Sequence, residues 1–159
     1  NYFSFQFTQI NYSLKTSGIM VKPISILMVE DNHGDVLLTE ETLYDGKISN
    51  VLNSVSHGEA AIEYLEDAKQ GKHILPDLIL MDINLPRLNG HEVISYIRKD
   101  DALKDTPIFI VSSSRAPADL EKSRPFVQHY LVKPMDLMEF EKGIRKIDQF
   151  SFSIMRTEK

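Results

Sequence analysis

Five side chains capable of chemistry stand directly after short apolar runs of the sequence. They are Glu30 and Asp31 after residues 24–29, Asp82 after 78–81, Ser112 after 108–111 and Lys133 after 130–132. If these runs are parallel strands of one sheet, the side chains meet outside its carboxyl edge, where α/β proteins bind their ligands. The set would then combine three carboxylates, a hydroxyl and an ammonium group.

Three carboxylates held close together repel one another, and burying them without partners is costly. A Mg²⁺ ion resolves this conflict, because it prefers oxygen ligands and one to three carboxylates are enough to hold it. The sequence has no cysteine and no pair of histidines at ligand spacing, which argues against zinc. The expected cofactor is therefore Mg²⁺.

A carboxylate beside Mg²⁺ and a lysine can act as a nucleophile toward phosphorus and form an aspartyl phosphate. Lys133 could pair with Asp82 at rest and with a phosphoryl oxygen later, while the Ser112 hydroxyl can donate to another phosphoryl oxygen. Most of the catalysis would then come from positioning and electrostatic stabilisation.

The segments that must position these residues alternate between strand-like apolar runs and stretches whose apolar residues have helical spacing. The apolar runs, with a weaker one at residues 50–55, have the character of buried strands. Helical spacing follows them at residues 36–44, 61–68, 93–97 and, over a shorter stretch, 117–125. The last helix is the clearest, because one stripe carries Leu137, Phe140, Ile144 and Ile147. Five strand–helix units predict an α/β fold, a doubly wound five-stranded parallel sheet with five helices.

Composition narrows the class of protein. The 159 residues suit one domain, and the formal net charge of −5 argues against a general nucleic-acid binder. The lack of cysteine excludes a disulfide scaffold and fits a reducing compartment. No apolar stretch is long enough to cross a bilayer, and the start lacks the basic region of a signal peptide. We therefore expect a cytoplasmic protein with neither nucleic acid nor membrane as a partner.

The order and spacing of these motifs resemble the bacterial response-regulator receiver family, of the chemotaxis-regulator-like type. The resemblance extends over residues 24–148. It is carried by Glu30-Asp31, Met81-Asp82-Ile83-Asn84-Leu85-Pro86, Val111-Ser112 and Tyr130-Leu131-Val132-Lys133-Pro134. It implies a flavodoxin-like receiver fold and a phosphorylation switch, which catalyses only its own phosphorylation and dephosphorylation.

The resemblance also implies a role for each matching position. Asp82 would be the phosphoacceptor. Glu30 and Asp31 would be the acid pair that holds Mg²⁺, together with Asp82 and the backbone carbonyl of Asn84.

The remaining matches concern two switch residues and the lysine of the site. Ser112 would be the switch hydroxyl, and Tyr130 the switch aromatic, whose ring turns inward when that hydroxyl moves toward the phosphoryl group. Lys133 would be the lysine of the site, with a cis bond to Pro134, which proline makes energetically accessible.

A narrower resemblance, carried by the segments 29–32, 34–36, 84–86 and 133–136, is to single-domain regulators paired with phytochrome-type sensor kinases. It implies a sensor histidine kinase or phosphotransfer protein as the donor and an unknown downstream protein as the target. Signalling would act through changed protein–protein interaction, because too few residues follow Ile147 for an effector domain.

The sequence departs from the family between Ser112 and Lys133, where it is one residue shorter than expected. The segment Pro125-Phe126-Val127-Gln128-His129 replaces the usual small turn before the fifth strand. The form of the fourth helix is therefore open, and so is a homodimer like those of relatives.

Other interpretations of the same residues remain. Asp82 could be a turn residue, and Glu30 and Asp31 could cap the following helix. The whole chain could be a constitutive interaction module that has kept the site without using it. A phosphatase with an aspartyl nucleophile would need a second acid where Asn84 stands, and a flavin-binding protein would need a phosphate-binding loop in place of the acid pair.

The ends of the chain are expected to lie outside the domain. We divide the chain into an N-terminal extension (1–21), a receiver domain (22–148) and a C-terminal tail or helix extension (149–159). The extension could be an over-long start or a remnant of cloning. Phe3, Phe5 and Phe7 nevertheless alternate with polar residues as in a half-buried strand, which suggests an ordered segment.

Overall fold

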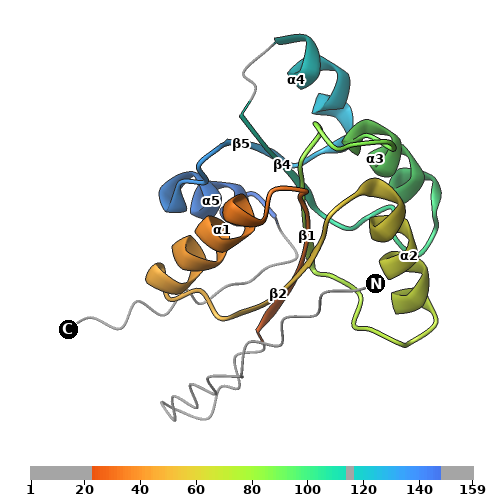
Figure 1. The fold of residues 1–159 in the computed structure, drawn as a ribbon, viewed down its shortest axis with the longest axis horizontal. Helices are drawn as coiled ribbons and strands as arrows, with labels where there is room; N and C mark the ends of the chain where they lie inside the picture. The colour runs from red at the N-terminus through yellow and green to blue at the C-terminus, as the bar shows by residue number, and fades with distance from the viewer. Residues whose placement is uncertain (1–22, 114–116, 148–159) are drawn as a thin grey trace.

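The computed structural model describes residues 23–113 and 117–147. They form one five-stranded sheet in the order β2-β1-β3-β4-β5, with every neighbouring pair parallel (Figure 1). The strands are β1 (Ile24–Val29), β2 (Asn50–Val55), β3 (Leu78–Met81), β4 (Ile108–Ser112) and β5 (His129–Val132). The predicted fold class is confirmed.

Helices cover both faces of the sheet. They are α1 (His33–Asp45), α2 (Gly58–Lys69), α3 (Gly90–Lys99), α4 (Pro117–Ser123), which a 3₁₀ turn continues at Arg124–Phe126, and α5 (Leu137–Arg145). Figure 1 shows α1 and α5 on one side of the sheet and α2 and α3 on the other. In the described part of the chain, no helix is both long enough and apolar enough to span a bilayer.

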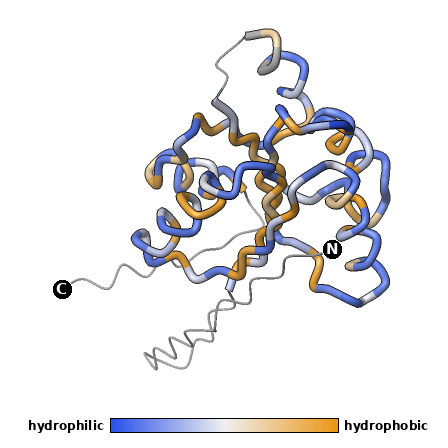
Figure 2. The backbone as a smooth tube through the Cα atoms, viewed as in Figure 1, coloured by the Kyte–Doolittle hydropathy of each residue, from blue (hydrophilic) through white to orange (hydrophobic). Residues whose placement is uncertain are grey.

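The core is split by the sheet into two apolar layers. Val36, Leu43 and Phe140 pack on one face, with the buried side chains of α1 and α5, whereas Leu65 and Ile97 pack on the other face from α2 and α3. Strands β1, β3 and β4 are buried along their whole length, which is why their sequences are mostly apolar and do not alternate with polar residues. Figure 2 shows the hydrophobic residues concentrated along these strands.

Capping hydrogen bonds at the first turns of α1 and α3 hold the loops that lead from the sheet into these helices. Asn32 caps α1 by accepting hydrogen bonds from the backbone N–H groups of Gly34 and Asp35, so the cap is neither Glu30 nor Asp31. Asn89 and Glu92 form a capping box at the start of α3.

The residue that follows Asn89 must be small. A Cβ atom at Gly90 would lie 2.5 Å from the carbonyl oxygen of Asp82 and 2.7 Å from the Cα of Ile83. Glycine therefore allows the start of α3 to pack directly on the backbone of the predicted phosphoacceptor.

Three local expectations need correction. Ser112 is the last residue of β4 rather than the first residue after it, and β5 begins one residue earlier than expected, at His129. Ile147 is buried but lies beyond the end of α5 at Arg145, so it packs from the following turn.

The Lys133–Pro134 peptide bond is cis, as the family resemblance implied.

Some expectations fall outside the described residues. They concern the alternating phenylalanines near the start, the extension of the last helix through Phe150 and Ile154, and the boundaries at residues 21 and 149. These remain predictions.

Candidate functional site

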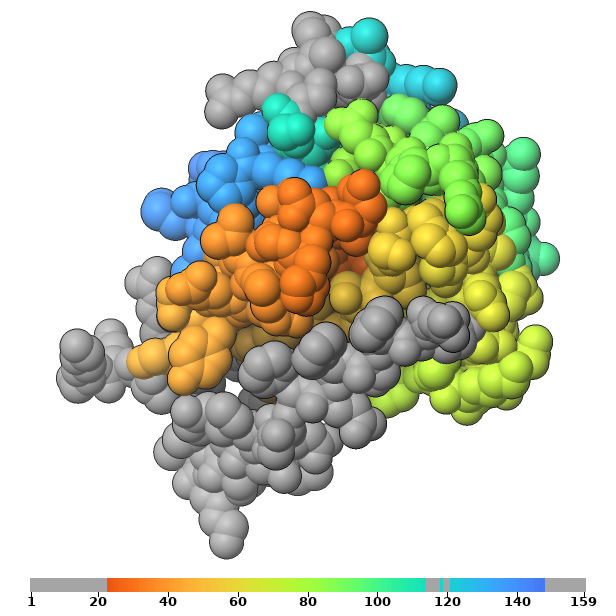
Figure 3. Space-filling view, in the orientation of Figure 1, coloured from red at the N-terminus to blue at the C-terminus, as the bar shows by residue number. Residues whose placement is uncertain are grey.

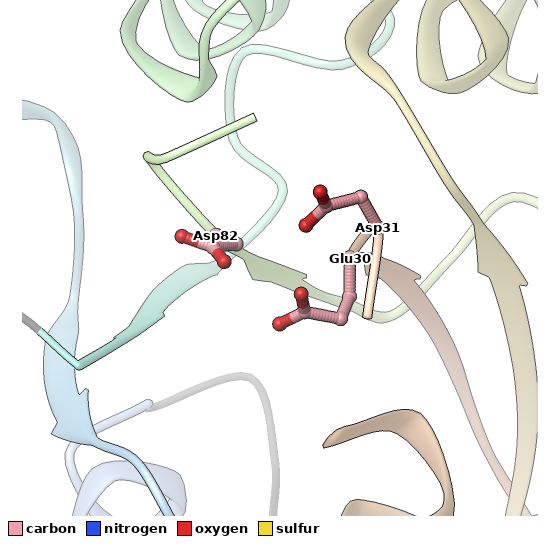
Figure 4. Close-up of side chains that lie close together, drawn as sticks. All are labelled: Glu30, Asp31 and Asp82. Carbon is pink, nitrogen blue, oxygen red and sulfur yellow. The ribbon is translucent and has the colours of Figure 1, made fainter. Parts of the chain in front are cut away.

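The three predicted carboxylates meet where β1 and β3 leave the sheet. Val29 pairs in register with Met81, and the next residues along the two strands are Glu30 and Asp82. One carboxylate oxygen from each of Glu30, Asp31 and Asp82 lies within 4.8 Å of the others (Figure 4). Glu30 and Asp82 are 3% and 5% exposed, whereas Asp31 is exposed. The acids therefore form one cluster that is open to solvent on the side of Asp31.

Lys133 brings a positive charge into this cluster from the end of β5. Its Nζ atom lies 2.7 Å from Oδ2 of Asp82 and also forms an ion pair with Oε2 of Glu30. A third partner is Asp35, whose Oδ2 lies 3.0 Å away. The backbone N–H of Lys133 donates to the carbonyl of Ser112, which ties the lysine to the end of β4.

Burial and charge pull the pKa values of this cluster in opposite directions. Burial raises the pKa of Glu30 to about 7, although the Lys133 ammonium and the Asn32 N–H favour its ionised form. Burial alone would lower the pKa of Lys133, but hydrogen bonds to Asp82, Glu30 and Asp35 outweigh it and raise that pKa. Lys133 is therefore held as a cation, while Glu30 is a carboxylate whose charge needs further compensation.

The other oxygen of Asp82 is held by the loop that follows it. The backbone N–H of Asn84 donates to Oδ1 of Asp82 at 2.8 Å, and the Asn84 side-chain amide donates to the hydroxyl of Ser112 at 3.2 Å. Ser112 is fully buried. Tyr130, on the adjacent strand β5, is half-buried and packs against the apolar layer beneath α2 and α3.

The donor set fits a hard divalent cation. It consists of carboxylate oxygens only, and a single ammonium group cannot balance Glu30, Asp31 and Asp82 together. A divalent ion would supply the missing positive charge and keep water on its exposed side. Asp31 is exposed, so this side is accessible, and in the space-filling view of Figure 3 the segment after β1 (orange) lies at the surface.

The structure brings all the predicted site residues to one end of the sheet, and it adds Asp35, which sequence reasoning missed as a member of the site. The signal was present but ambiguous, because an acid in the first turn of a helix is common for helix-dipole reasons alone. Only the tertiary contact with Lys133 distinguishes Asp35 from such a residue.

Comparison with known proteins identifies the family. Residues 26–145 match the response regulator receiver domain. The chain belongs to the response regulator receiver family. Receiver domains are signalling switches rather than classical enzymes. The response regulator Rcp1 of Synechocystis is 33% identical over 80% of this chain and 88% of its own length.

Solved receiver structures share this architecture. The bacteriophytochrome response regulator RtBRR superposes with a TM-score of 0.71 at 32% identity, over 81% of this chain and 80% of its own. The Mn²⁺-bound form of Rcp1 superposes with a TM-score of 0.65 at 32% identity, over 80% of this chain and 94% of its own. The phosphorylated cyanobacterial phytochrome response regulator RcpA superposes with a TM-score of 0.66 at 32% identity, over 77% of this chain and 89% of its own. An acidic cluster like that of Glu30, Asp31 and Asp82 is thus consistent with divalent-metal binding.

Proposed function

We propose that this chain accepts a phosphoryl group on Asp82, in a Mg²⁺-dependent reaction, from a sensor histidine kinase or a phosphotransfer protein. The observation that carries the proposal is the environment of the Asp82 carboxylate. It is buried beside two further acids, with the Lys133 ammonium 2.7 Å from one of its oxygens. A structural turn residue would not need such a set of charges.

The transfer would be a direct displacement at phosphorus. An oxygen of Asp82 forms the new O–P bond while the bond from phosphorus to the donor nitrogen breaks, and the donor imidazole leaves with the electron pair. Lys133 would offer its ammonium to the phosphoryl oxygens, and Ser112 its hydroxyl. A Mg²⁺ ion held by Glu30, Asp31, Asp82 and the carbonyl of Asn84 would neutralise charge on the phosphoryl group.

The output would be a change in protein–protein interaction. A phosphoryl group adds negative charge and acceptor oxygens at Asp82. We infer that Ser112 then leaves Asn84 for the phosphoryl group and that Tyr130 turns inward, altering the surface that an unknown downstream protein reads. The chain would catalyse only its own phosphorylation and dephosphorylation, within a receiver domain spanning residues 22–148.

The similarity to Rcp1, RtBRR and RcpA supports a narrower proposal about the signalling partner. Two of these proteins are named as bacteriophytochrome or phytochrome response regulators. We propose that the sensor of this chain is also of the phytochrome type and that both act in the cytoplasm.

The proposal is tested by intact mass after incubation with acetyl phosphate and Mg²⁺. The wild type should gain one phosphoryl group, and chelation of Mg²⁺ should prevent it. Asp82→Asn should gain none, whereas Asp101→Asn, which removes a fully exposed carboxylate, should behave as wild type. Equal labelling of Asp82→Asn would refute the assignment. No labelling of any variant, with Mg²⁺ bound, would favour a constitutive interaction module.

A further inference from the structure

The ammonium group of Lys133 is saturated by carboxylates. A lysine has three N–H donors. Three carboxylate oxygens surround the Nζ of Lys133, one from each of Glu30, Asp82 and Asp35. A phosphoryl oxygen can therefore bind this ammonium only if one of the three carboxylates gives up its place.

Asp35 differs from the other two partners in its surroundings. Its side chain is 28% exposed, compared with 1% for Glu30 and 6% for Asp82. It does not belong to the cluster of metal-donor atoms, and it contacts the site through the ammonium group of Lys133. The cap of α1 fixes its backbone, because the Asp35 N–H donates to the side chain and to the carbonyl of Asn32.

Asp35 is therefore the carboxylate that is released most easily. Glu30 would be left as a buried charge without its cation, which is strongly unfavourable, whereas Asp35 can turn to water. A cavity of about 10 Å³ lies beside the pair, lined by Asp35, Lys133, Thr39 and Pro134 among others. A volume of this order is close to what one water molecule needs.

We propose that Asp35 is a positioning residue that holds the Lys133 ammonium away from the phosphoryl position and thereby weakens phosphoryl binding at Asp82. This inference rests on the proposed function of Asp82. Two effects act in the same direction: Asp35 competes with the phosphoryl group for the Lys133 ammonium, and the negative charge of Asp35 repels that group.

The test is the affinity for beryllium fluoride, an anion that occupies the place of a phosphoryl group, measured by titration at saturating Mg²⁺. Asp35→Asn keeps the shape of the side chain and removes its charge. It should bind beryllium fluoride about three- to tenfold more tightly than wild type, the order expected for one unit charge at the rim of a site. Glu41→Gln makes the same charge change on an exposed face of α1 and should shift the affinity by less than about twofold.

The possible results separate the two proposals. Damage to the fold could only weaken binding, so tighter binding by Asp35→Asn supports the positioning role. Equal or weaker binding by Asp35→Asn overturns it, and so does a gain of the same size in Glu41→Gln. Failure of the wild type itself to bind beryllium fluoride would overturn the proposed function as well.

Discussion

The side-chain amide of Asn84 donates a hydrogen bond to the Ser112 hydroxyl across 3.2 Å, which links the loop after Asp82 to the end of β4. The backbone N–H of the same asparagine donates to Asp82 Oδ1. One residue thus contacts both the proposed phosphoacceptor and the proposed switch hydroxyl. A change at Asp82 can therefore affect Ser112 through the hydrogen bonds of Asn84.

Replacing Ser112 with alanine should separate phosphorylation from its transmission. Ser112→Ala keeps Asp82 and Lys133, so it should still be labelled by acetyl phosphate. It lacks the hydroxyl that would move, so the change in the Tyr130 ring resonances on adding beryllium fluoride should be much smaller than in wild type. Ser113→Ala, at the exposed neighbour, is the control and should respond fully. An undiminished Tyr130 response in Ser112→Ala would remove Ser112 from the switch.

Lys133 should stabilise the fold as well as serve the site. Lys133→Met leaves Glu30 and Asp82 buried without their cation, so its free energy of unfolding in a chelating buffer should fall by about 3 kcal/mol. Excess Mg²⁺ should restore part of this loss. Lys142→Met breaks an exposed ion pair with Glu139 and should lower the free energy of unfolding far less than Lys133→Met does. Equal losses in urea denaturation of the two variants would contradict this account of the cluster.

His129 should make the fold less stable in mild acid. Burial, aided by the nearby Lys146, lowers the pKa of His129, although Glu139 acts in the opposite direction. The folded state therefore binds fewer protons than the unfolded state below about pH 6.5, and stability falls as the pH decreases through that range, by up to about 1.4 kcal/mol per pH unit.

The corresponding variant is His129→Phe, which keeps a ring against Phe109. Its free energy of unfolding should depend less steeply on pH between pH 6.5 and 5 than that of the wild type. His33→Gln, at an exposed histidine, should leave the slope unchanged. A wild-type slope in His129→Phe would show that other groups cause the acid sensitivity.

Arg98 should anchor the segment that departs from the family pattern. Its guanidinium donates to the carbonyls of Phe126, Lys104 and Thr106 at 2.8–2.9 Å, thereby joining the α3–β4 loop to the chain before β5. Arg98→Met should lower the free energy of unfolding by about 2 kcal/mol, and Lys99→Met, on the exposed side of α3, by less than about 0.5 kcal/mol. Comparable losses in the two variants would show that this anchoring contributes little.

The sequence predicted the strands, the helices and the fold class because these depend on the local pattern of apolar and polar residues. Continuous apolar runs identified the central strands, and helical stripes such as that through Phe140 and Ile144 identified the helices. The order of the strands then placed Glu30 and Asp82 together, since parallel strands end at the same edge of a sheet.

What the sequence did not predict depends on tertiary contacts of single side chains. Asp35 has the local pattern of an ordinary first-turn acid, and only its distance to Lys133 makes it part of the site. Gln128 gave no signal either, although its Oε1 accepts the backbone N–H of Ile108 at 2.7 Å and fixes the unusual approach to β5.

The most direct test of the central claim is to locate the acyl phosphate chemically. Borohydride reduces an aspartyl phosphate to homoserine, and peptide mass spectrometry then identifies the residue. After incubation with acetyl phosphate and Mg²⁺, homoserine should be found at position 82 and at no other aspartate of the chain. Homoserine at Asp31, Asp35 or another position instead would contradict the account, because it would place the nucleophile elsewhere.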